Sequence, residues 1–398
     1  MNATDPVILS AARTPFGRFG GVFRDLSAVE LGTVAARAAL ERARIAPDAV
    51  DTAMFGQIYQ GGAGMNPARQ VAMGVGVPNR VPAMTINQVC ASGLQAVALA
   101  AQSIRLGEAE VALAGGMESM SQVPYVLPDA RWGARLGHTR QLDALLHDGL
   151  WDAFHNCHMA TTAEGLAAEF GITRAAQDEF ALRSQRRYAA ALAACHFADE
   201  VVPVEVTQRR GPPRRVTADE HPRPDTTLEA LATLRPVFAG GSTITAGNAA
   251  GINDGATALI VASPAWAARH GHAPLATLRS VAVVGVEPLR MGIGPVPAIR
   301  AVLDRTGLTL ADIDLLEVNE AFAAQVLTVE AELGWDRAKV NVNGGAIAIG
   351  HPLGASGARV LATLIFELAR RDAARGIAAL CVGGGMGIAA LVERSSTS

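Results

Sequence analysis

The sequence predicts an α/β protein made of two similar halves with an insertion between them. Short apolar or β-branched runs alternate with alanine-rich helical patterns along 398 residues, an order typical of a sheet covered by helices on both faces. A faint internal repeat and two loop-rich stretches divide the chain. Half of the residues are apolar and 18% are charged, which excludes a mostly disordered protein.

The predicted elements follow this alternation in chain order. A strand at residues 7–9 precedes a helix at 31–42, where small and apolar residues recur at helical spacing. The other strands are predicted at 111–114, 258–262, 315–318 and 378–382, and the other helices near 297–305, 321–333 and 358–370.

The internal repeat predicts a duplicated unit. Ala91-Ser92-Gly93 opens a helical run that leads to a strand and then to Gly115-Gly116-Met117. Ala355-Ser356-Gly357 opens a second such run, which leads to a strand and to Gly384-Gly385-Met386. The second copy is longer by about one loop, as expected for a duplicated α/β unit.

Two stretches interrupt the alternation and predict an insertion. Residues 121–149 are polar with several prolines and glycines, and residues 207–225 are rich in charge and proline. Ordinary surface loops are the alternative for most of these positions, but together they enclose two helical patterns within 151–199. Long insertions often form lids or binding surfaces. The predicted units are an N-terminal half (1–120 plus 250–272), the inserted loop domain (121–249) and a C-terminal half (273–398).

Composition excludes several function classes. The formal net charge of −3 provides no positive field for nucleic acid. Lys339 is the only lysine, which excludes a Gly-Lys-Ser/Thr phosphate loop and leaves one Schiff-base candidate. There is no secretory pattern at the N-terminus and no apolar run near 18 residues, so we expect a cytoplasmic protein without a membrane span. The four cysteines form no disulfide framework. His155 and His158 flank Cys157 but lack further ligands, so no metal is expected.

Cys90 is a candidate nucleophile. A strand-like segment leads into it and a helical pattern follows directly. A thiol at a helix N-terminus lies in a positive potential, which predicts a lowered pKa and a thiolate. The alternative is a buried cysteine acting as a small apolar residue.

His351 lies in a glycine-dense run, from Asn341 to Arg359, and is followed by Pro352. A rigid turn before a helix would hold the imidazole in one orientation. Histidine is the usual partner of an activated cysteine. The glycines favour a ligand or active site over close backbone packing alone.

Cys381 ends an apolar strand and is followed by a glycine turn that includes Gly383. The run after Gly387 is strand-like, so no helix N-terminus is available for a pyrophosphate and a nicotinamide site is excluded. Free amides in such a turn can form an oxyanion hole. Asn319 lies where a strand passes into a helix, where it either caps the helix or orients a water or a carbonyl oxygen.

These four segments in this order resemble the thiolase family, the acyl-CoA C-acyltransferases. The resemblance extends from Arg13-Thr14-Pro15-Phe16-Gly17 to Gly387, and the motifs around the four candidate residues are intact. It implies a five-layered αβαβα arrangement. Within the family, His158-Met159, Thr245–Asn248 and Met291–Pro295 resemble short-chain, biosynthetic-type acetyl-CoA acetyltransferases.

The resemblance implies a ping-pong Claisen condensation or thiolysis that interconverts two acetyl-CoA with acetoacetyl-CoA and CoA. Cys90, activated by His351, would carry the acyl group, and Cys381 would move the α-proton. Asn319, through a water, and His351 would stabilise the enolate. The backbone N–H groups of Cys90 and Gly383 would hold the tetrahedral intermediate. Coenzyme A thioesters are the implied substrates, and no tightly bound cofactor is expected.

The resemblance also assigns CoA binding to the inserted domain. Ala250 departs from the family, since many relatives have a serine beside the pantetheine there; we expect altered acyl selectivity. Arg223 would meet the adenosine or phosphate end of CoA, although a solvated charge is nearly as good an interpretation. The implied substrate-binding residues are Leu150, His158, Met159, Arg223, Phe238, Ala246, Ala250, Met291 and Phe322.

Two alternatives to acetoacetyl-CoA chemistry remain at this point. A degradative 3-ketoacyl-CoA or 3-ketoadipyl-CoA thiolase would carry the same motifs. A non-catalytic acyl-CoA-binding relative would need neither thiol, so intact Cys90 and Cys381 disfavour it. The resemblance further implies a dimer or a dimer of dimers, and the insertion favours a homotetramer.

Overall fold

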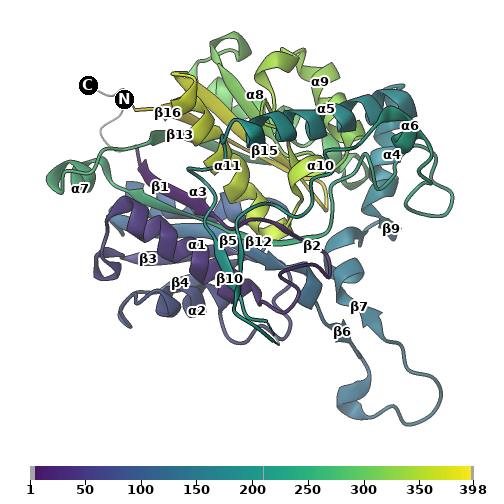
Figure 1. Cartoon of the computed structure of the whole chain (residues 1–398), viewed down its shortest axis with the longest axis horizontal. Helices are drawn as coiled ribbons and strands as arrows, with labels where there is room; N and C mark the ends of the chain where they lie inside the picture. The colour runs from purple at the N-terminus through teal and green to yellow at the C-terminus, as the bar shows by residue number, and fades with distance from the viewer. Residues whose placement is uncertain (1–4, 209, 396–398) are drawn as a thin grey trace.

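The computed structural model describes residues 5–208 and 210–395. Within them, one ten-stranded mixed sheet runs through the molecule in the order β14-β15-β16-β13-β1-β12-β5-β3-β4, with β2 paired to β12 (Figure 1). The strands are β1 (Val7–Arg13), β2 (Gly17–Arg18), β3 (Thr52–Gly56), β4 (Ala83–Ile86), β5 (Val111–Ser119), β12 (Asn253–Ala262), β13 (Ala276–Gly285), β14 (Leu315–Val318), β15 (Arg375–Val382) and β16 (Met386–Arg394).

The two halves of this sheet repeat one pattern. In the first half β3 pairs in parallel with β4 and β5, and β12 lies antiparallel between β5 and β1. In the second half β14 pairs in parallel with β15 and with Val340, and β16 lies antiparallel between β15 and β13. Even the register shift in β1, between Ile8 and Ser10, recurs in β13 between Leu278 and Ser280. The predicted duplication is therefore confirmed.

Helices cover both halves and also separate them. α1 and α2 pack on the first half, α8 packs on β13, β15 and β16, and α3 and α11 pack against each other between the halves. These are five layers, so the predicted α/β architecture is confirmed. The helices are α1 (Ala28–Ala43), α2 (Pro67–Gly74), α3 (Ser92–Arg105), α7 (Pro264–Arg269), α8 (Pro295–Thr306), α9 (Ala323–Leu333), α10 (Ala346–Ile349) and α11 (Leu353–Arg370).

The predicted strands and helices listed above are all present, most of them longer than predicted. β3, with five residues, and β13, with ten residues, were not predicted. Short 3₁₀ turns connect several elements, at Pro47–Ala49, Met120–Gln122, Ala130–Trp132, Pro288–Ile293, Leu310–Asp312 and Arg337–Lys339.

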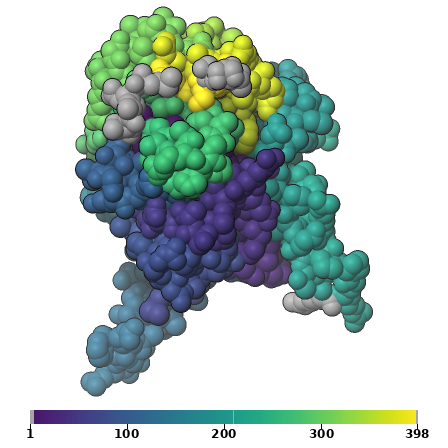
Figure 2. Space-filling view, turned by 90° about the vertical axis from the view of Figure 1, so that its left-hand side faces the viewer, coloured from purple at the N-terminus to yellow at the C-terminus, as the bar shows by residue number. Residues whose placement is uncertain are grey.

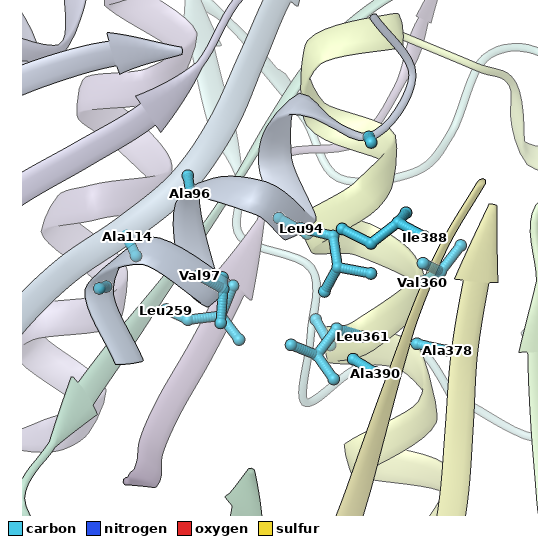
Figure 3. Packing of buried hydrophobic residues seen from close by; sticks show 14 of the residues in the cluster. Leu94, Ala96, Val97, Ala114, Leu259, Val360, Leu361, Ala378, Ile388 and Ala390 are labelled. Carbon is cyan, nitrogen blue, oxygen red and sulfur yellow. The ribbon is translucent and has the colours of Figure 1, made fainter. Parts of the chain in front are cut away.

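The central helix pair α3 and α11 meets backbone to backbone. A Cβ on Gly93 would lie 2.8 Å from the Ala358 nitrogen, and a Cβ on Gly357 would lie 2.5 Å from the Leu94 nitrogen. Larger side chains pack on either side of this contact. Figure 3 shows Leu94 from α3 beside Val360 and Leu361 from α11, with β15 and β16 behind them. The glycines of the two repeated Ala-Ser-Gly motifs therefore let the two halves touch.

The insertion supplies the projections of the molecule. The hairpin β6–β7 forms an arm at the lower right of Figure 1, and β10–β11 forms a second projection, which Figure 2 shows in teal at the opposite side from the blue arm. Its elements are β6 (Tyr125–Val126), β7 (Leu142–Asp143), a π-helical turn (Leu146–Leu150), β8 (Trp151–Asp152), β9 (Cys157–His158), α4 (Met159–Glu169), α5 (Arg174–Ala193), β10 (Val204–Val206), β11 (Arg214–Val216) and α6 (Leu228–Ala232).

Arg13 ties the insertion to the first strand of the sheet. Its guanidinium is fully buried and pairs with Glu200 at 2.7 Å and with Asp219 at 2.6 Å. The Tyr188 hydroxyl donates to the same Asp219 carboxylate. Because removing one partner would leave buried charges uncompensated, this cluster holds the long insertion in place.

Within residues 5–208 and 210–395, the structure contains no helix of the length and apolarity that crossing a membrane requires.

We predict that Gly357→Ala destabilises the fold by about 1–3 kcal/mol, since its methyl group must push α3 away from α11. Chemical denaturation followed by circular dichroism measures the change. The matched control is Gly165→Ala in α4, where no atom lies within 4 Å of the added Cβ. It should gain about 0.5–1 kcal/mol from the better helix propensity of alanine. Equal stability of wild type and Gly357→Ala would contradict the close contact.

Candidate active site

A cavity of about 750 Å³ opens where the two halves and the insertion meet. Its walls are mostly apolar, with a few polar groups, which is typical of small-molecule sites. The sequence-predicted residues that border it are Cys90, Leu150, His158, Met159, Arg223, Ala246, Ala250, Met291, Phe322, His351, Cys381 and Gly383.

Asn319 and Phe238, also predicted from the sequence, lie behind this wall. Asn319 Nδ2 is 3.3 Å from His351 Nε2. α9 begins at Ala323 and has Phe322 as its N-cap, so Asn319 does not cap this helix. The Phe238 ring stacks on His158 with centroids 6.3 Å apart. The structure therefore brings all the predicted site residues to one place.

Cys90 sits on a strained turn between β4 and α3. Val89, the residue before it, has φ of 47°, which is rare for a β-branched side chain. Ser92 holds this turn, since its Oγ accepts from the Gln88 N–H at 2.8 Å and donates to the Val89 carbonyl at 2.6 Å. Backbone strain of this kind is kept where surrounding contacts enforce it, which is frequent at active sites.

The Cys90 thiol is neutral at rest, contrary to the lowered pKa expected from its place before α3. Burial raises its pKa to about 11, although N–H groups of Gly383 and of Cys90 itself lower the pKa by hydrogen bonding to the sulfur. The positive potential at the start of α3 is smaller in effect than the desolvation of the thiolate by the residues packed around it. A thiolate would form at Cys90 near neutral pH only if a base accepted its proton.

His351 borders the same cavity as Cys90 and has one ring nitrogen that can accept a proton. Its Nδ1 lies 2.6 Å from Ser356 Oγ, and Ser356 donates its own proton to the Pro352 carbonyl. The Ser356 oxygen must then accept from His351, so the ring proton is on Nδ1 and the lone pair is on Nε2. Burial first, and then the Arg359 charge, lower the His351 pKa to about 3. The resting imidazole is neutral and can accept a proton.

Cys381 ends β15, and the tight turn that follows exposes a donor. Gly384 and Gly385 have φ of 81° and 86°, which side-chain-bearing residues rarely adopt. This geometry leaves the Gly383 N–H directed at the Cys90 sulfur. Burial, and then the neighbouring Cys90, raise the Cys381 pKa. Cys381 is therefore a neutral thiol in the resting protein.

Apolar side chains surround Cys381 within the cavity. Met159, Met291 and Phe322 pack around its sulfur. His158 borders the same cavity and caps α4, with Nδ1 accepting from the Ala160 N–H at 3.0 Å. Its other nitrogen, Nε2, therefore carries the proton and is a donor, and burial lowers its pKa.

Glu118, at the end of β5, was not predicted from the sequence. Its carboxylate is fully buried and accepts the N–H groups of Ile58, Tyr59 and Gly354. Burial raises its pKa to about 7, while these three hydrogen bonds lower the pKa. Gly354 lies in the first turn of α11, three residues after His351, so Glu118 ties the His351 segment to the first half.

Further bordering residues also escaped the sequence argument. Arg18 and Phe19 directly follow the Arg13–Gly17 motif, which was the available signal for them. His221 packs flat on Gly251, and burial, followed by the Arg223 charge, lowers its pKa to about 4. The other bordering residues are Val89, Met120, Gly149, Glu220, Pro222, Val237, Ala249, Gly251, Ile252, Ala321 and Leu353.

No group of three or more His, Cys, Asp or Glu side chains in the described ranges is arranged to hold a metal ion.

The raised pKa of Cys90 predicts slow alkylation of the free protein at neutral pH. Because the thiolate is the nucleophile, its modification by iodoacetamide should rise roughly tenfold per pH unit between pH 7 and 10. Peptide mass spectrometry distinguishes Cys90 from the exposed Cys195, which serves as the reference for an accessible thiol. A Cys90 rate that levels off below pH 8 would show a stabilised thiolate and contradict this electrostatic description.

The chain matches known proteins along nearly its whole length. Residues 6–265 match the family model described as thiolase, N-terminal domain, and residues 272–394 match thiolase, C-terminal domain. Acetyl-CoA acetyltransferase of Cupriavidus necator is 54% identical over 391 residues, 98% of this chain and 100% of that protein. The probable acetyl-CoA acetyltransferase of Escherichia coli is 52% identical over 98% of this chain and 99% of its own.

Solved structures agree with this relationship. Human mitochondrial 3-ketoacyl-CoA thiolase superposes with a TM-score of 0.96 at 45% identity, covering both chains completely. Acetyl-CoA acetyltransferase of Bacillus anthracis gives 0.96 at 45% identity over 98% of this chain and 99% of that one. The human enzyme in complex with CoA gives 0.95 at 45% identity over 99% of both. The resemblance stated from the sequence is confirmed, and the chain belongs to the thiolase family.

Proposed function

We propose that this protein is an acetyl-CoA C-acetyltransferase, which interconverts two acetyl-CoA with acetoacetyl-CoA and CoA. One observation carries the proposal: two buried thiols, a neutral imidazole and a backbone N–H directed at the Cys90 sulfur converge on one cavity. They belong to Cys90, Cys381, His351 and Gly383. Binding alone would require neither thiol. The names of the most similar relatives listed above support the same activity.

The first half-reaction transfers an acetyl group to Cys90. The Cys90 proton moves to His351 Nε2, and the sulfur attacks the thioester carbonyl. The N–H groups of Cys90 and Gly383 hold the negative oxygen of the tetrahedral intermediate. When this collapses, Cys381 gives its proton to the departing CoA sulfur. The products are acetyl-Cys90, free CoA, a Cys381 thiolate and a protonated His351.

The second half-reaction forms the carbon–carbon bond. The Cys381 thiolate removes an α-proton from a second acetyl-CoA, and a raised thiol pKa makes it a stronger base for this step. Protonated His351, with Asn319 acting through a water, stabilises the enolate oxygen. The enolate attacks acetyl-Cys90, acetoacetyl-CoA departs, and the Cys90 sulfur recovers its proton from His351. All protons and leaving groups are then restored.

The inserted domain, residues 121–249, is proposed to bind CoA. His158, Leu150 and Phe238 would contact the pantetheine, and the exposed Arg223 would meet the phosphate or adenosine end. Met291 and Phe322 would limit the acyl group, since they pack beside Cys381. The solved structure of human mitochondrial 3-ketoacyl-CoA thiolase in complex with CoA supports a CoA site in this fold.

Assembly and location stay predictions. The β6–β7 arm exposes Tyr125, Trp132 and Leu136 to solvent in the single chain. Contact with further copies would cover this apolar surface, which supports the expected homotetramer. The cytoplasmic location rests on the sequence argument alone.

A degradative 3-ketoacyl-CoA or 3-ketoadipyl-CoA thiolase is the second candidate. Its support is the high TM-score with human 3-ketoacyl-CoA thiolase, together with Ala250, which borders the cavity with no hydroxyl to offer a substrate. The two candidates share every catalytic residue, so only chain-length preference distinguishes them.

The deciding experiment is thiolysis by free CoA of acetoacetyl-CoA, 3-ketohexanoyl-CoA and 3-ketoadipyl-CoA at equal concentration. We expect the four-carbon substrate to be cleaved fastest, because Met159, Met291 and Phe322 close the space around Cys381. Faster cleavage of either longer substrate would favour the degradative candidate. Cleavage of none of the three would refute both, and Cys90→Ala provides the inactive reference.

Cys381→Ser should separate the two half-reactions. The variant keeps the Cys90 nucleophile, so incubation with acetyl-CoA should still label Cys90 by mass spectrometry. Condensation should fall by at least about 10²-fold, since a serine hydroxyl is a much poorer proton-transfer group than a thiol. Normal condensation in this variant would remove Cys381 from the proton-transfer role, and an acetyl group found on the Cys90→Ala protein would remove Cys90 from the nucleophile role.

A further inference from the structure

One buried cation lies directly behind the catalytic cavity. Arg359, on α11, has no exposed surface, and its Nη1 donates to Glu317 Oε1 at 2.6 Å. Its Nη2 donates to Asn319 Oδ1 at 3.3 Å. Glu317 is on β14, and Asn319 directly follows that strand. A single guanidinium therefore donates hydrogen bonds to two side chains at the end of β14.

The contact decides which end of the Asn319 amide faces His351. The backbone N–H of Asn319 donates to the Ala379 carbonyl at 2.9 Å, so the main chain is fixed to β15. The remaining freedom is the rotation that exchanges the amide oxygen with the amide nitrogen. Arginine has donors and no acceptor, so the oxygen must face Arg359 and Nδ2 must face His351.

The hydrogen bonds on both sides of His351 then have one direction. Arg359 donates to the Asn319 oxygen, and Asn319 Nδ2 donates toward His351 Nε2. On the other side, His351 Nδ1 donates to Ser356, which donates to the Pro352 carbonyl. A flipped Asn319 would place an oxygen where the substrate's developing negative oxygen needs a donor.

We propose that Arg359 is a positioning residue for carbon–carbon bond formation, which holds Asn319 with its N–H groups toward His351 and the substrate. The inference rests on the proposed function, since it concerns the enolate step of that reaction. Arg359 touches neither substrate nor reacting atoms. It acts through the orientation of one amide.

Burying the Arg359–Glu317 ion pair costs desolvation free energy, which supports a functional reason for its presence. Buried ion pairs frequently contribute no more stability than apolar side chains of the same size. Arg359 also leaves its Nε without a hydrogen-bond partner among the described residues, which adds to the cost. After burial itself, the Arg359 charge is the further cause that lowers the pKa of His351, so the same residue helps keep the imidazole neutral.

The test compares the two half-reactions in Glu317→Gln/Arg359→Met, which removes both buried charges together. The rate of Cys90 acetylation, measured as the burst of CoA release, should stay within about threefold of wild type. Condensation, and exchange of the acetyl-CoA methyl protons with deuterium oxide, should fall by about 10²–10³, the loss typical of one oxyanion donor. Equal losses in both half-reactions, or a loss in neither, would overturn the proposal.

A matched control removes another ion pair from the same helix. Glu367→Gln/Arg370→Met changes a pair of α11 residues that have no contact with Asn319, and both half-reactions should stay near wild type. If the first double variant fails to fold, Arg359→Lys keeps the charge beside Glu317 while losing the second arm of the fork. Its condensation should fall about tenfold with acetylation retained, and wild-type condensation would overturn the proposal.

Coupling with Asn319 completes the test. Asn319→Ala combined with Glu317→Gln/Arg359→Met should be no slower in condensation than Asn319→Ala alone, because one amide carries both effects. Losses that multiply would show that Arg359 acts elsewhere. Failure of the proposed function is separate, since wild-type protein would then neither acetylate Cys90 nor condense acetyl-CoA.

Discussion

The closeness of α3 and α11 is the constraint on which the site depends. Gly93 and Gly357 let the two backbones touch, and each helix follows directly on a catalytic segment: Cys90 precedes α3, and His351 precedes α11. A side chain at either glycine would hold the helices apart and separate the thiol from the imidazole. The same two glycines therefore allow the two halves to pack together and bring the candidate catalytic segments to one cavity.

Burial determines the chemistry of the resting site. It raises the pKa of both Cys90 and Cys381 and lowers that of His351, so the free protein carries a neutral thiol at Cys90, where a thiolate was expected. A neutral site is less costly to bury and less open to unwanted reactions of a thiolate. The negative charge then develops during the reaction, beside donors that are already in place, such as the Gly383 N–H. Preorganised donors of this kind are usually the largest contribution to catalysis.

Local patterns were enough to predict the architecture and most of the candidate residues that border the cavity. Cys90, His351 and Cys381 each stand at a strand or turn end within a distinctive run, and the repeat of Ala-Ser-Gly predicted the duplication. Glu118 and Arg359 were not predicted, because a buried charge is recognised only by the partners that folding brings to it from distant segments. The same limit explains the wrong expectation for the Cys90 pKa. Desolvation depends on everything packed around the sulfur, whereas the helix terminus is visible in the sequence.

The two halves of the duplicated sheet differ at one pair of equivalent strand ends. β5 occupies in the first half the position that β15 occupies in the second. At the end of β15, the chain turns on glycines and leaves the Gly383 N–H directed at the Cys90 sulfur in the cavity. At the end of β5, the Glu118 carboxylate takes up three N–H groups, one of them from the opposite half. Of two equivalent strand ends, one therefore borders the cavity, and the other, through Glu118, holds the two halves in the arrangement that shapes the cavity.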